Sequence, residues 1–448
     1  MAAPSSTATN GSGNDSSIDI TAQCLCKKHS FTATVPLASL PLKATACHCD
    51  SCRYNTGALY SADAGWPGDP AAVRESGLSV YYFSDNINVL FCGRCGSTMF
   101  FEEKEHGKVE TSYAVFTGAL PNVELPGGGP LVAIEHHMFL DDTRDGGASP
   151  WLRNTDYDVK NGCYKAARRW HGRRFKSDEI LEGDDWPSLK DLSVMTDGAA
   201  AQTHASDSQE LSDITIPVKC RCGGVHVELL ASVARKEFSR MQRDQLPRFV
   251  DPDNNKSLAS FDVCDSCRTV SGLDIFHWTF FWLKHIRFPQ NAASSSGPEF
   301  PVSTAALKKA VLQDKEARDP RLGALEMYES SPDVQRYFCG GCSAVVFYAV
   351  DDLANQVDVA LGLLRAPPVG KNTSDGSDVH GGARAEHLLS WKFGGTMAWQ
   401  QDVQGGWRDG LVKIVTDDVT AWRDKRGLAK NWRVRNDEKA AVEGAKSG

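Results

Sequence analysis

The chain has 448 residues, of which 41% are hydrophobic and 24% charged, and this is enough for two or three globular domains. Its net charge of −8 argues against a general nucleic-acid binder, since such proteins are normally basic. Residues 1–17 are small and polar without a signal-peptide core, which predicts a disordered N-terminus on a cytoplasmic protein, with the nucleus as the alternative location. The most apolar stretch, 275–288, is too short and too charged to cross a membrane and predicts a buried strand.

Cysteines are the most informative residues of the chain. There are 14, and without a secretory signal they indicate metal binding rather than disulfides. All but Cys163 fall in C-x-C or C-x-x-C groups, and Cys163 is expected to be a free thiol.

The first group of cysteine motifs lies in a β-rich unit, residues 18–142. Runs of alternating or β-branched residues predict strands, and Gly- and Pro-rich turns separate them. The expected strands are 31–35, 78–83, 88–91, 98–101 and 134–140.

An extension and linker follow, residues 143–213. The basic residues between 165 and 176 suggest a polyanion site, but acidic residues follow at once and favour a solvated surface instead. The acidic, Ser- and Ala-rich run beyond them is typical of an interdomain linker. We therefore expect an irregular segment without a nucleic-acid ligand.

The motif series then returns in residues 214–394, which predicts an internal duplication. The landmarks, in order, are Cys220-Arg221-Cys222 for Cys24-Leu25-Cys26, Cys264-Asp265-Ser266-Cys267-Arg268 for residues 49–53, Phe338-Cys339-Gly340-Gly341-Cys342 for residues 91–95, and Glu386-His387 for Glu135-His136 or His137. An insertion in the second copy predicts a short helix at 304–317. Residues 395–448 form a C-terminal tail, expected as a surface helix with a disordered end.

Two sets of four cysteines have the spacing of closed zinc sites. Residues i and i+2 of a strand face the same way, so a C-x-C pair on a strand aims two thiolates at one metal, and a C-x-x-C turn adds two more. Such a site staples an early strand to a late hairpin. The predicted structural sites are Cys24, Cys26, Cys92 and Cys95 in the first copy and Cys220, Cys222, Cys339 and Cys342 in the second.

The remaining motif of the first copy supplies only three thiolates, Cys47, Cys49 and Cys52. Three protein ligands with one open position are the signature of catalytic zinc. Water or a small thiol would fill the gap, and Arg53 would offset the negative charge. The alternative is that a distant residue such as His137 closes the site and makes it structural.

In the second copy Asp262 stands where the first copy has Cys47. A site of Asp262, Cys264 and Cys267 has legitimate zinc ligands but is less thiophilic, so it either binds metal more weakly or stays empty. We therefore expect about two zinc ions in the first repeat and one or two in the second, with the chemistry in the first.

These motifs together resemble one family, the glutathione-dependent formaldehyde-activating enzyme and centromere protein V family. The resemblance rests on the C-x-C pair, the run Ala46-Cys47-His48-Cys49-x-x-Cys52-Arg53 with Gly57 soon after, the knuckle Phe91-Cys92-x-x-Cys95-Gly96-Ser97, and His137 before residues 138–140. The first copy matches every cysteine, and the second matches all but the one replaced by Asp262. The resemblance implies a mainly β fold of two tandem zinc-stapled tent-like modules built from small antiparallel sheets, each with one structural and one further zinc.

The activity that the resemblance implies is the addition of glutathione to formaldehyde, classed as carbon–sulfur lyase chemistry. Cys47, Cys49, Cys52 and Arg53 would be the catalytic residues, while Arg53, Asn55 and His137 are positional candidates for contacting a glutathione-like thiol. The rival hypothesis, favoured by Asp262, is a non-catalytic tandem zinc module that binds a thiol ligand or a protein partner. No membrane partner is expected.

Overall fold

The computed structural model describes residues 16–104, 111–143, 145–167, 169–171, 180–181, 214–290, 297–367 and 382–447. Residues 1–15 of the N-terminus expected to be disordered, and most of the expected linker, lie outside these ranges, whereas Ser17 begins a strand. The fold is mixed α/β with more strand than helix, and two similar sheets dominate it. Among the described helices, none combines the length and the apolar character needed to cross a membrane.

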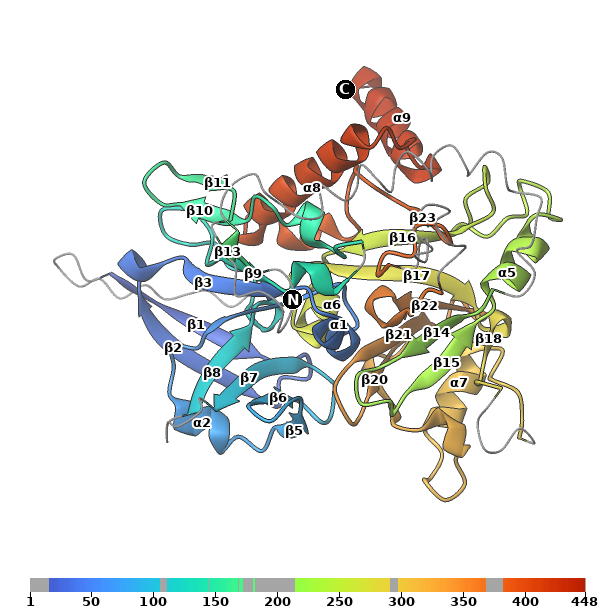
Figure 1. Cartoon of the computed structure of the whole chain (residues 1–448), viewed down its shortest axis with the longest axis horizontal. Helices are drawn as coiled ribbons and strands as arrows, with labels where there is room; N and C mark the ends of the chain where they lie inside the picture. Colours follow the sequence, from blue (N-terminus) through green and yellow to red (C-terminus); the bar gives the residue numbers. More distant parts are fainter. Residues whose placement is uncertain are drawn as a thin grey trace.

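The first repeat consists of a hairpin and a large sheet (Figure 1). The hairpin pairs β1 (Ser17–Gln23) with β2 (Ser30–Pro36). Seven strands of the sheet lie in the order β9 (Val132–Met138), β3 (Leu42–Cys47), β4 (Ser61–Gly65), β8 (Thr111–Phe116), β7 (Thr98–Lys104), β6 (Ile87–Phe91) and β5 (Ser79–Tyr82). Beyond β9 the sheet is extended by β12 (Arg169–His171) and β13 (Ile180–Leu181), and the short helices are α1 (Asp50–Thr56) and α2 (Pro70–Arg74).

The second repeat has the same arrangement. Its sheet runs β23 (Leu389–Trp391), β16 (Ser257–Asp262), β17 (Phe276–Trp282), β22 (Gln356–Ala360), β21 (Val345–Val350), β20 (Val334–Cys339) and β19 (Leu325–Ser331). A smaller sheet joins β14 (Ile216–Lys219), β15 (His226–Leu229) and β18 (Ile286–Arg287), and the helices are α5 (Ala231–Phe238), α6 (Asp265–Ser271) and α7 (Thr304–Val311). The helix expected at 304–317 is therefore present, although it ends earlier.

The sheets are larger than the small antiparallel sheets expected, and they are not antiparallel throughout. Each repeat builds a seven-strand set, and its last strand in sequence joins in parallel, β9 beside β3 and β23 beside β16. The chain reaches these edges by long connections rather than by hairpins, so a parallel pair is allowed there. The fourth landmark also fails, because His136 lies inside β9 whereas His387 precedes β23.

The described part of the segment after the first repeat, which belongs to the expected extension, packs into the core. It contains η4 (Ser149–Trp151) and a hairpin of β10 (Asp156–Asp158) with β11 (Cys163–Lys165). Trp151 is fully buried, and its ring packs against aromatic residues of the second repeat and of the C-terminal segment, namely Phe261, Trp391, Phe393 and Trp422.

The C-terminal residues are likewise not a mere surface tail. They form α8 (Arg408–Lys425) and α9 (Trp432–Ser447), at the top of Figure 1. Val412, Val415 and Val419 recur at helical spacing and are buried, so α8 presents an apolar stripe to the rest of the protein.

A pair of matching contacts joins the two repeats. Gly118 N–H donates to the carbonyl of Gly272 at 2.8 Å, and Gly362 N–H donates to the carbonyl of Gly57 at 2.8 Å. Gly57 and Gly272 end the equivalent helices α1 and α6 in left-handed backbone, with φ of 82° and 78°. Each repeat therefore offers the same helix end to the other, as the subunits of a twofold dimer do.

Candidate metal centres

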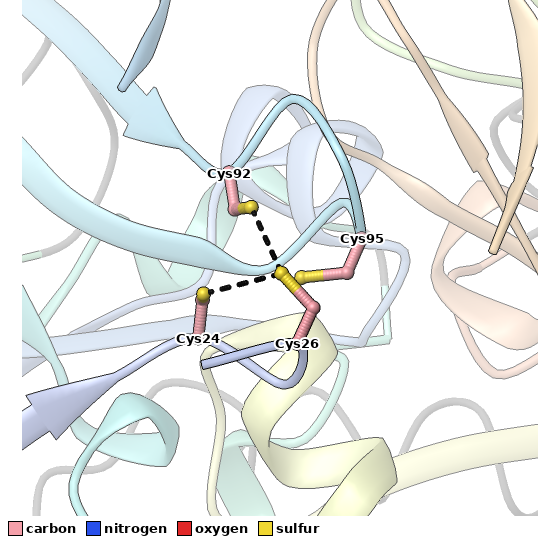
Figure 2. Close-up of side chains that lie close together, drawn as sticks. All are labelled: Cys24, Cys26, Cys92 and Cys95. Carbon is pink, nitrogen blue, oxygen red and sulfur yellow. Dashed lines mark hydrogen bonds between the residues drawn. The ribbon is translucent and has the colours of Figure 1, made fainter. Parts of the chain in front are cut away.

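The first set of four cysteines converges on one point (Figure 2). The Cys26 sulfur lies 3.6 Å from that of Cys24 and 3.6 Å from that of Cys92, and Cys95 completes the group. A disulfide needs about 2 Å between sulfurs. A tetrahedron with zinc–sulfur bonds of about 2.3 Å has edges of about 3.8 Å. The residues present therefore fit a metal such as zinc.

The second set of four cysteines has the same geometry. The Cys220 sulfur lies 3.6 Å from Cys222 and 3.7 Å from Cys339, and Cys222 lies 3.5 Å from Cys339. Cys342 is the fourth member, and Cys222 is the exposed one. This group too suits a metal ion.

The local reason for this convergence differs from the one expected. β1 ends at Gln23 and β14 at Lys219, so both C-x-C pairs lie in turns and not on strands. In the first turn Lys27 has a φ of 60°, and Leu25 N–H donates to the Ser97 hydroxyl at 3.0 Å. Tight turns on both sides, tied to each other by this bond, bring the thiols together.

Cys47, Cys49 and Cys52 form a third cluster at the junction of β3 and α1. Cys47 ends the strand, and Cys49 caps the helix by accepting a hydrogen bond from Cys52 N–H. All three are buried, with Cys47 at 9% the most exposed. Hydrogen bonds from Cys49 and Cys52, together with burial, raise the pKa of Cys47 well above its usual value. Three such thiols need a cation beside them before all can ionise.

The histidines near this cluster bind each other. His48 Nε2 lies 2.9 Å from His137 Nδ1, and the two buried rings stack at 5.2 Å. Burial lowers the pKa of His48 to about 3, so it stays neutral. In the part of the chain that the structure describes, no fourth Cys, His or carboxylate joins the cluster of three thiols. The geometry favours the open site over closure by His137.

Arg53 lies at the contact between the repeats. Its Nη1 donates to the carbonyls of Gly362 at 2.9 Å and Leu364 at 2.8 Å, and its Nη2 donates to Asp50. Through its bonds to Gly362 and Leu364, the guanidinium binds the second repeat. Asn55, by contrast, is buried at 1% with neither amide atom hydrogen-bonded within the described ranges. The second repeat has Val270 at that position of the matching helix.

The fourth cluster contains Asp262, Cys264 and Cys267. Asp262 Oδ1 accepts from Cys264 N–H at 2.7 Å, and its Oδ2 lies 3.6 Å from the Cys267 sulfur. A residue that the sequence did not single out faces this cluster, because Arg336 Nη1 lies 3.5 Å from the Cys267 sulfur. Register identifies its counterpart as Val89, since both precede the aligned Phe-Cys pairs by the same spacing.

A carboxyl that the sequence analysis also missed lies on the sheet beside the cluster of Cys47, Cys49 and Cys52. Ser61 pairs with Cys47 in register, and Asp63 follows two residues along β4, on the same face. Burial and the neighbouring Glu103 raise the pKa of Asp63 to about 7. Only the strand pairing could have indicated this residue, since nothing near it in sequence marks a site.

Four clusters of mostly buried thiols, one with a carboxylate, define a protein suited to metal ions such as zinc. In a comparison with protein families, residues 19–128 match the family described as glutathione-dependent formaldehyde-activating enzyme. The first repeat is thus a domain of this family, and the second repeat is supported by the structure alone. Comparison with curated proteins gave no match. Comparison with solved structures gave none either.

Proposed function

We propose that the protein is a zinc-dependent enzyme of the carbon–sulfur lyase type that joins a glutathione-like thiol to a small aldehyde. The single observation that carries this proposal is the buried cluster of Cys47, Cys49 and Cys52, which has three ligand atoms and no fourth among the described residues. It lies within the matched family domain. The two sets of four cysteines would hold structural zinc.

The residues around the three thiols suit such chemistry. Bound zinc would supply a Lewis-acidic position at which a thiol is held as thiolate. Phe83, Val89 and Phe116 pack against the cysteines and keep the site apolar, which strengthens electrostatic interactions inside it. The free amide of Asn55 is a candidate donor to an aldehyde oxygen.

Asp63 is the proposed proton donor and acceptor. When the thiol becomes a thiolate, its proton passes to the Asp63 carboxylate. In the addition, the sulfur lone pair forms the carbon–sulfur bond, the π electrons of the carbonyl move to its oxygen, and that oxygen takes the proton from the Asp63 carboxyl. The reverse reaction returns the proton to the carboxylate and breaks the carbon–sulfur bond. A carboxyl with a pKa of about 7 is suited to both directions near neutral pH.

A second candidate function is a non-catalytic zinc module that binds a thiol or a protein partner. It is favoured by the fourth cluster, where one thiolate is replaced by Asp262 and Arg336 brings a positive charge. If this second function is right, the cluster of Cys47, Cys49 and Cys52 binds a thiol without turnover. A location in the cytoplasm or nucleus stays a prediction for either function.

The test compares Cys49→Ser with Cys163→Ser in an assay for S-hydroxymethylglutathione formation. Cys163 is an exposed cysteine outside every cluster, so its variant controls for loss of a thiol as such. We expect Cys49→Ser to lose one zinc and at least about 100-fold in rate with its circular dichroism unchanged. Asp63→Asn should keep the zinc but lose rate.

Each other outcome has a clear meaning. Full activity in Cys49→Ser would show that the cluster of Cys47, Cys49 and Cys52 does not carry the reaction. Wild-type protein that binds glutathione without any turnover would replace the enzyme with the binding module. Equal losses in Cys49→Ser and Cys163→Ser would show that the assay reports general thiol damage.

A further inference from the structure

The second repeat places two arginines beside residues of the first repeat that neighbour the three-thiol cluster in space or in sequence. The carbon at the centre of the Arg221 guanidinium lies 5.7 Å from the ring centre of Phe83, a residue that packs against Cys47, Cys49 and Cys52. The corresponding carbon of Arg365 lies 4.2 Å from the ring centre of Tyr54. Tyr54 belongs to α1, the helix that carries Cys52.

Main-chain bonds fix both arginines in place. Arg221 N–H donates to the carbonyl of Tyr54 at 2.9 Å, and Arg221 lies between two cysteines of the second four-cysteine set. Arg365 N–H donates to the carbonyl of Pro217 at 2.8 Å. Both side chains are exposed, and neither forms an ion pair with any residue that the structure describes. Their charges are therefore free to meet an anion.

The duplication supplies an internal comparison. The position of Arg221 is Leu25 in the first repeat. Arg365 follows Leu364 directly after η7 (Leu361–Leu363), and its counterpart Pro121 follows Leu120 after η2 (Thr117–Ala119). At these two equivalent positions the first repeat thus presents no charge to the degenerate Asp262 cluster. The two arginines accompany only the cluster with the full set of thiols.

We propose that Arg221 and Arg365 form a carboxylate-binding site that selects an anionic peptide thiol for the cluster of Cys47, Cys49 and Cys52. This inference rests on the proposed function, because it assumes that a thiol is held at that cluster. It makes the active site composite: the first repeat supplies the thiolates and the second repeat supplies the recognition. Glutathione, with two carboxylates, is the ligand of this class that we would test.

The experiment measures dissociation constants by calorimetry for glutathione and for its dimethyl ester, which keeps the thiol but lacks both carboxylates. The variants are Arg221→Ala, Arg365→Ala, Cys49→Ser and Arg94→Ala. Arg94 is an exposed arginine within the other four-cysteine set, so it controls for disturbance of such a loop. The alanine at position 221 keeps the main-chain bond to Tyr54.

We expect each of Arg221→Ala and Arg365→Ala to weaken glutathione binding about threefold to tenfold and to leave ester binding unchanged, while Arg94→Ala changes neither. The loss should shrink at high salt, since exposed charges are screened. Wild-type-like glutathione binding in both arginine variants overturns the inference, as does equal binding of the ester by the wild type. If Cys49→Ser binds both ligands normally while Arg221→Ala and Arg365→Ala weaken the binding of glutathione but not of its ester, the proposed function fails and the carboxylate site stands.

Discussion

Arg336 replaces a small apolar residue of the first repeat, Val89, at a position facing a metal-type cluster. A guanidinium 3.5 Å from the Cys267 sulfur already supplies positive charge to the anionic ligands. A dication entering the same cluster is repelled by it. The cluster of Asp262, Cys264 and Cys267 should therefore hold zinc less tightly than the cluster of Cys47, Cys49 and Cys52.

We expect wild-type protein to contain about three zinc ions, and the Arg336→Val variant about four, by elemental mass spectrometry. Removing the guanidinium restores the apolar wall seen around Cys47 and takes away the positive charge that lies against the Cys267 sulfur. Val89→Arg is the matched reverse change and should lower the content toward two. Four zinc ions in the wild type would show that Arg336 does not oppose the metal.

At the same scale, residue identity and spacing were sufficient to group all thirteen motif cysteines and Asp262 into four clusters, because thiols in C-x-C and C-x-x-C pairs have few other uses without a secretory signal. Asp63, Arg221 and Arg336 were not predictable in this way. Each of these residues reaches its cluster through strand pairing or through contact between the repeats. The local sequence indicates neither kind of contact.

The turns between strands and helices set the contact between the repeats. A β-carbon added to Gly362 would lie 2.0 Å from the carbonyl oxygen of Ala58, and the neighbouring atoms belong to backbone that cannot move aside. Only glycine allows the N–H of residue 362 to reach the carbonyl of Gly57.

The Gly362→Ala variant should therefore lose about 3 kcal/mol in the free energy of unfolding, measured by urea denaturation. Gly65→Ala is the control, because nothing lies within 4 Å of an added β-carbon there. Its effect should stay within about 0.5 kcal/mol. A loss as large in Gly65→Ala, or none in Gly362→Ala, would contradict the close approach seen here.

Elements were predicted unevenly from the sequence. The runs that became β2, β5, β6 and β7 were clear because they alternate in polarity or are rich in β-branched and aromatic residues. β3 and β4 were missed because their short, Ala-containing sequences carry little β propensity and are placed by their neighbours. The buried stripe of α8 was present in the sequence, but its partner, Trp151, lies in a segment that composition made look like a linker.

At the scale of the whole molecule, the two repeats share structure at several points. Arg408 of α8 is buried, and its guanidinium donates to Asp274 at 2.7 Å and to the carbonyls of Thr117 at 2.6 Å and Leu120 at 2.9 Å. One C-terminal side chain thus binds both repeats. Arg53 makes the equivalent bridge from the first repeat to Leu364. Most buried apolar residues of both repeats also form a single cluster.

Because the interface contains buried charges and backbone bonds that neither repeat satisfies alone, we expect the two repeats to unfold together. Calorimetry should give one transition, and Cys222→Ser, which removes a ligand of the second four-cysteine set, should lower its midpoint by about 10 °C without splitting it. Hydrogen exchange on the same variant should then show β7 and β21 losing protection at one temperature. Cys163→Ser should leave the midpoint unchanged. Loss of β21 well before β7 would mean that the repeats are independent domains, and the composite active site would then lack the rigid contact that it needs.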